Sequence, residues 1–132
     1  MNKKRCPVCN KDLPIDAFHV RKGKRDGLQH SCKECHGEQR AEIRERRRRF
    51  VWDYLLEHPC VDCGEKDPIV LDFDHVRGTK IGNICTMMCT GQSLDRIKIE
   101  MDKCDVRCAN CHRRITAKRG QTYKTKFAQI VR

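Results

Sequence analysis

The spacing of apolar residues predicts one long helix in the first half of the chain. Between residues 36 and 58, apolar positions recur at helical spacing, and Glu42 with Arg46 forms an i,i+4 pair. Pro59 follows and should end this helix. Because the first half of the segment has few apolar residues, we expect only its second half to be buried.

A strand is predicted where apolar and polar residues alternate further along the chain. Residues 69–73 alternate in this way and are rich in β-forming side chains. The strand would present Asp74 and His75 at its end. Residues 76–92 contain three glycines and show little periodicity, so we expect a loop there.

The pattern after this loop predicts a helix, a strand and a second helix. Ser93 is suited to cap a helix whose apolar stripe includes Ile97. Residues 105–107 predict a short returning strand. A further helix is expected from the following cysteine pair to about Lys118, and the chain beyond it would be a short helix or a mobile arm.

The composition indicates that something other than a large core stabilises the protein. The chain has 132 residues, of which only 5% are aromatic and 36% are charged, so a thin core is expected. The 11 cysteines are an odd number, which fits disulfides poorly. No apolar run resembles a signal peptide or a membrane span. We therefore expect a cytoplasmic protein whose cysteines bind metal.

Two cysteine tetrads follow the spacing of structural zinc sites. Each consists of two C-x-x-C pairs, which supply the four thiolates of a tetrahedral zinc site. The tetrads are Cys6, Cys9, Cys32 and Cys35, and Cys60, Cys63, Cys108 and Cys111. We predict one structural Zn²⁺ in each. His30 and His36 are alternative ligands beside the first tetrad, although four thiolates already suffice.

Three cysteines remain outside the tetrads. Cys85 and Cys89 are four residues apart, and Cys104 precedes the last C-x-x-C pair. Three thiols make an incomplete zinc shell, so free or buried thiols are the favoured interpretation and a third metal site is the alternative.

The charge distribution favours a polyanionic partner. The formal net charge is +11, yet residues 60–112 carry 7 basic against 9 acidic residues. Residues 1–59 carry 15 against 9, and residues 113–132 carry 7 against none. Carboxylates in the middle suit a divalent cation, and basic flanks suit the phosphates of nucleic acid. Simple solvation of a basic protein is the alternative.

The second tetrad, the Asp74-His75 dipeptide and His112 form a constellation that resembles a known family. Together they look like the zinc-bearing branch of the HNH endonucleases, also called ββα-metal nucleases, as found in phage proteins and in the phage resolvase endonuclease VII. The resemblance covers residues 60–118 and depends on the whole constellation, because an Asp-His dipeptide alone is common.

The chain as a whole is expected to be a small, metal-stabilised α+β fold in four parts, and the resemblance accounts for the third of them. A zinc ribbon would occupy residues 1–36 and a charged linking helix residues 37–59. The ββα-metal HNH module would span residues 60–118, and residues 119–132 would form a basic tail.

The resemblance also implies roles for the residues of the module. Asp74 and His112 would bind one catalytic divalent cation, and His75 would act as general base. A base with a pKa near neutrality suits the deprotonation of water, and mixed oxygen and nitrogen ligands suit Mg²⁺, Mn²⁺ or Ni²⁺. Asp72 lies on the same strand face as Asp74 and could replace or assist it.

The middle asparagine of the family pattern is missing from its usual place. Many family members carry it a few residues before the last C-x-x-C pair, where this chain has Lys103-Cys104-Asp105. Asn83 and Asn110 are the candidates to replace it.

The predicted function is therefore a metal-dependent DNA endonuclease that nicks or cuts its substrate. The resemblance implies products with a 3′-hydroxyl and a 5′-phosphate, a phage or mobile-element origin, and a phage terminase as a candidate partner. The alternative is a two-zinc nucleic-acid-binding module without catalysis, which would not require Asp74, His75 and His112. The oligomeric state is left open by the sequence.

Overall fold

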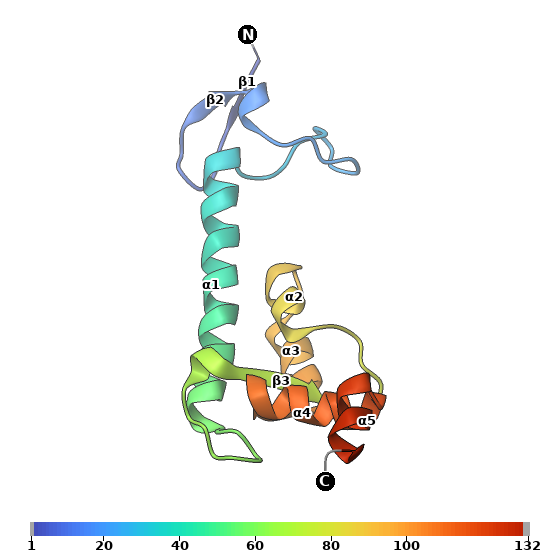
Figure 1. Cartoon of the computed structure of the whole chain (residues 1–132). Coiled ribbons are helices and arrows are strands. Elements are labelled where there is room, and N and C mark those ends of the chain that lie inside the picture. Colours follow the sequence, from blue (N-terminus) through green and yellow to red (C-terminus); the bar gives the residue numbers. More distant parts are fainter. Residues whose placement is uncertain (1, 131–132) are drawn as a thin grey trace. The chain divides into compact units, whose positions relative to one another are not determined.

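The computed structural model describes residues 2–130, which divide into two compact units with a boundary between Arg46 and Arg47. We call Met1–Arg46 the first unit and Arg47–Arg132 the second unit. The described residues form a small α+β protein with two two-stranded antiparallel sheets and five α-helices (Figure 1). None of these helices combines the length and apolar character needed to span a bilayer.

The first unit is a hairpin over a cysteine cluster. Strands β1 (Lys3–Arg5) and β2 (Asp12–Pro14) pair antiparallel, and a short 3-10 turn (Ile15–Ala17) follows. Its buried residues are Phe18, Leu28, Ser31, Cys6, Cys32 and Cys35. Because half of these are cysteines, the apolar core is too small to stabilise the unit without a metal ion.

Helix α1 (Lys33–Glu57) belongs to both units by sequence. It begins three residues before the predicted position, because its first turn also carries the last cysteine of the first tetrad. Glu42 and Arg46 form the expected exposed ion pair at 3.7 Å. Val51 and Leu55 are buried in the core of the second unit, which confirms that the second half of the helix is the packed half.

Two paired strands and a helix form the centre of the second unit. Strand β3 (Leu71–His75) pairs antiparallel with β4 (Cys104–Cys108), and α4 (Ala109–Gly120) follows directly. Strand β3 begins two residues later than predicted. The Asp67 side chain accepts a hydrogen bond from the Ile69 N–H, and a 3-10 turn (Pro68–Val70) therefore takes the place of the first strand residues. Figure 1 shows α4 running beside β3.

The predicted loop at residues 76–92 is wrong in part, since it contains α2 (Ile84–Cys89). Ile84 and Met87 of this helix are buried, and α2 packs beside α3 (Leu94–Met101) (Figure 1). Six residues are too few to reveal a helical period in the sequence. The Ser93 side chain caps α3 as predicted, by accepting a hydrogen bond from the Arg96 N–H.

The basic C-terminal segment is helical within the described residues. Helix α4 ends where Gln121 adopts a left-handed conformation with φ 44°. Helix α5 (Tyr123–Ile130) then exposes Tyr123, Phe127 and Ile130.

Candidate functional site

The first tetrad has the geometry of a four-thiolate zinc site. The sulfur atoms of Cys6, Cys9, Cys32 and Cys35 all lie within 4.8 Å of one another. The Cys32 N–H donates a hydrogen bond to Cys6 Sγ at 3.3 Å, and such backbone donors lower the pKa of Cys6 to about 6. A thiol that ionises readily is a ready metal ligand.

The second tetrad, within the second unit, has the same geometry. Cys63 Sγ lies 3.7 Å from Cys108 Sγ, close to the roughly 3.8 Å that separates sulfurs around a tetrahedral zinc. Burial raises the pKa of Cys60, but backbone hydrogen bonds at Cys108 and Cys63 outweigh burial and lower it to about 6. The Cys108 side chain and burial raise the pKa of Cys111 to about 12.

Equivalent turns present the first two cysteines of each tetrad. The Asn10 N–H donates to the Cys6 carbonyl oxygen and the Gly64 N–H to the Cys60 carbonyl oxygen. Both residues have positive φ, 58° at Asn10 and 77° at Gly64. This conformation is accessible to glycine and, less readily, to asparagine. Both tetrads are therefore compatible with structural zinc, as predicted.

The other candidate metal ligands lie outside these clusters. The two tetrads are the only groups of three or more potential ligands that converge in the described part of the chain. His36 Nδ1 lies 3.4 Å from Gln29 Nε2. Cys85 and Cys89 are exposed thiols, whereas Cys104 is buried and donates to the Glu100 carbonyl oxygen. The free-thiol interpretation of these cysteines is thus favoured by the structure.

Asp74 and His112 approach each other beside the second tetrad. Asp74 lies on β3 with only 4% of its surface exposed, and His112 lies in the first turn of α4. His112 Nε2 is 3.7 Å from Asp74 Oδ1. His112 Nδ1 is 3.3 Å from Asp72 Oδ2, so the carboxylate of Asp72 orients the ring toward Asp74.

Two arginines bind the Asp74 carboxylate, and no pattern in the sequence indicates them. Arg107 Nη1 donates to Oδ2 at 2.6 Å and Arg119 Nη1 donates to Oδ1 at 2.8 Å. Burial raises the pKa of Asp74, but Arg119, His112 and Arg107 outweigh burial and hold it below its usual value. Asp74 is therefore ionised, as a metal ligand must be.

His75 points to the other face of β3, where it meets Glu100 of α3. His75 Nε2 lies 2.8 Å from Glu100 Oε1. Glu100 is 1% exposed and also accepts hydrogen bonds from the Ile81 N–H and the Lys103 ammonium group. Burial raises the pKa of Glu100, but Lys103, Ile81 and His75 outweigh it and lower the pKa to about 2.

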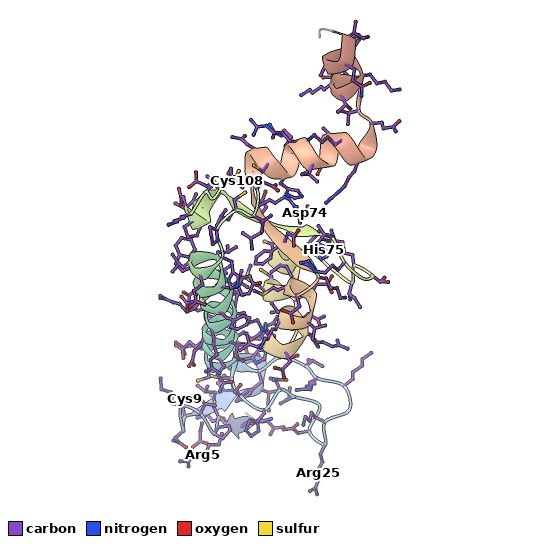
Figure 2. All side chains as sticks on the ribbon, turned by 90° about the horizontal axis from the view of Figure 1, so that it is seen from below. Arg5, Cys9, Arg25, Asp74, His75 and Cys108 are labelled. Atoms are coloured by element: carbon purple, nitrogen blue, oxygen red, sulfur yellow. The ribbon has the colours of Figure 1, made fainter. Side chains whose placement is uncertain are left out.

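One cavity connects the two histidines although they lie on different elements. It has a volume of about 450 Å³ and is lined by His75, His112, Asp72 and Asn83 together with apolar side chains. Asn83 therefore shares this cavity with His75, whereas Asn110 is exposed on α4 and does not line it. Figure 2 shows Asp74 and His75 together on β3, with Cys108 at the start of α4 nearby.

Comparisons with protein-family models, with curated proteins and with solved structures gave no match.

Proposed function

We propose that the second unit is a metal-dependent endonuclease of the HNH, or ββα-metal, type that hydrolyses DNA phosphodiester bonds. The observation that carries this proposal is the shared cavity. A histidine held by a buried carboxylate and a second histidine beside an ionised aspartate open into the same space. A binding module without catalysis would have no need of either arrangement.

The arrangement of elements supports the proposal. Strand β3 pairs with β4, and α4 follows β4 directly and contacts both strands, although α2 and α3 lie between β3 and β4 in the chain. The second tetrad joins the turn before β3 to the junction of β4 with α4. A zinc ion there would hold His112 beside Asp74, although 37 residues separate them in the sequence.

The donor set of Asp74 and His112 fits a hard divalent cation. Their oxygen and nitrogen atoms are 3.7 Å apart, a gap that an ion about 2.1 Å from each ligand could bridge. Oxygen with nitrogen ligation suits Mg²⁺, Mn²⁺ or Ni²⁺. When bound, such an ion would neutralise the charge that develops on the scissile phosphate and the leaving oxygen.

His75 is suited to take a proton from water. Glu100 is ionised and can only accept, so the His75 Nε2 facing it carries the ring proton. This leaves Nδ1 as the ring nitrogen that can accept a proton. Glu100 thus sets both the tautomer and the orientation of the general base.

Basic side chains beside the site are suited to hold the DNA backbone. A second cavity of about 500 Å³ adjoins His112 and Asp72, and Arg113, Tyr123 and Lys124 line it. Cations and an aromatic ring are the groups with which proteins bind phosphates and stack on bases.

Cleavage of supercoiled plasmid by the zinc-loaded protein with added Mg²⁺ or Mn²⁺ tests this function. We expect nicked or linear products, and a loss of at least about 100-fold in rate for His75→Ala, since a general base contributes that much. His58→Ala is the matched control, because His58 is an exposed histidine of the second unit that stacks on Tyr54.

Two results would contradict the proposal. The first is undiminished cleavage by a His75→Ala protein that still contains zinc. The second is absence of cleavage by the unaltered protein on plasmid, linear, single-stranded and four-way DNA alike. With retained DNA binding, that second result would favour the two-zinc binding module.

A further inference from the structure

The two arginines that hold Asp74 are not equivalent. Arg107 has a side chain that is 11% exposed and contacts Asp62 and Asp105 as well as Asp74. Arg119 has a side chain that is 48% exposed, and Asp74 is its single ion-pair partner among the described residues. Arg107 is thus fixed in place by three carboxylates, whereas Arg119 is free to leave by breaking one contact.

Arg119 and His112 compete for the same oxygen atom. Arg119 Nη1 lies 2.8 Å from Asp74 Oδ1, and His112 Nε2 lies 3.7 Å from that atom. The other oxygen, Oδ2, is held by Arg107 at 2.6 Å. A cation shared by Asp74 and His112 would have to bind at Oδ1, next to a positive charge that repels it.

We infer that Arg119 is an exchangeable counter-ion of this site: its guanidinium neutralises Asp74 in the free protein, is displaced by the divalent cation, and then binds the DNA phosphate. This inference rests on the proposed function and adds a residue to it. Arg119 lies in the last turn of α4, so a side-chain rotation is enough to release it.

The guanidinium suits both partners. It binds a carboxylate or a phosphate through the same parallel N–H groups, and it stays charged at every working pH. Once displaced, it remains tethered beside the site, where the phosphate would bring negative charge. Arg119 would therefore pair with a negatively charged group both before and after the substrate binds.

Manganese binding without DNA tests the first half of the inference. Electron paramagnetic resonance on the zinc-loaded full chain measures the affinity for Mn²⁺, and thiolate sites should retain zinc under these conditions. We expect Arg119→Ala to bind Mn²⁺ about tenfold more tightly, since a charge-assisted contact no longer competes. Arg119→Gln, which keeps more of the side chain, should behave similarly.

Lys118→Ala is the matched control. It removes the same charge from the same turn of α4, and Lys118 is exposed. The difference between the Arg119 and Lys118 variants therefore isolates the direct contact from the general loss of positive charge. Equal Mn²⁺ affinities in the two variants would overturn the inference.

Plasmid cleavage tests the second half. At saturating Mn²⁺, Arg119→Ala should lower kcat/KM by about tenfold despite its tighter metal binding, and Arg119→Lys should recover part of the loss. Unchanged kcat/KM would overturn the phosphate role. The proposed function itself requires a Mn²⁺ site that Asp74→Ala abolishes. If the unaltered protein has no such site, the proposed function fails as well. If only the Arg119 and Lys118 variants fail to differ, the inference about Arg119 is wrong but the proposed endonuclease function is not contradicted.

Discussion

Glu100 combines deep burial with a full set of hydrogen-bond donors. Lys103, His75 and two backbone N–H groups contact its carboxylate. The burial of Glu100 is indicated by the sequence. Glu100 follows Ile97 by one helical turn and so lies on the apolar stripe of α3. A charged residue on a buried stripe indicates a partner that the fold must supply.

Glu100 should make the stability of the second unit depend on acid pH. Its pKa is about 2 in the folded protein, below the usual 4.5, so its stabilisation is complete above about pH 4.5 and is lost as pH falls toward 2. Glu100→Gln should therefore cost about 1–3 kcal/mol at neutral pH, and the difference from the unaltered protein should shrink in acid.

Urea unfolding followed by Trp52 fluorescence measures this difference. Trp52 is the single tryptophan of the chain and lies in the second unit. Glu57→Gln, at an exposed position near the end of α1, is the control and should leave the unfolding midpoint unchanged. A Glu100→Gln difference that is the same at pH 7 and at the lowest pH at which the protein keeps its zinc would contradict the role assigned to the carboxylate.

The cysteine ligands could be predicted from the sequence, whereas the arginines could not. The C-x-x-C spacing is local, so it indicates two tetrads before the fold is known. The contacts of Arg107 and Arg119 depend on how β3, β4 and α4 are placed against one another. Asp74 and Arg119 are 45 residues apart, and no periodic pattern relates them.

Helix caps were predictable for a similar reason, because a cap acts within one turn. The sequence indicated Ser93 and the helix after it, but it did not indicate α2. That helix is stabilised by packing of Ile84 and Met87, which depends on tertiary contacts rather than on local propensity. The position of such a short helix therefore cannot be predicted from the periodicity of its sequence.

Ser93→Ala should destabilise the second unit by about 1 kcal/mol. The substitution leaves the Arg96 N–H without its side-chain acceptor at the start of α3. Ser93→Asp keeps an acceptor and adds a favourable charge at the helix N-terminus, so it should retain stability. Thermal unfolding monitored by Trp52 fluorescence distinguishes the two, and equal loss in both variants would argue against the cap.

The two units have separate cysteine tetrads, so each should depend on its own zinc. Cys6→Ser should reduce the zinc content from about two ions to about one per chain, because the remaining three ligands bind zinc poorly. The second unit should keep its ion and its Trp52 unfolding midpoint. Metal analysis together with fluorescence checks both expectations.

Loss of both ions, or a shifted Trp52 transition, would show that the units are coupled. The corresponding variant Cys60→Ser should have the opposite effect. The first unit should retain its ion, and the unfolding midpoint reported by Trp52 should fall.

The register of β3 on β4 decides which side chain of β3 faces Glu100. Leu71 pairs with Cys108 at one end of the strand pair, and His75 pairs with Cys104 at the other. A slip of one residue would turn Asp74 to the face that His75 now occupies. Because Cys108 belongs to the tetrad, a bound zinc would help to hold the strand register, and removal of the zinc would permit the slip that takes His75 away from Glu100.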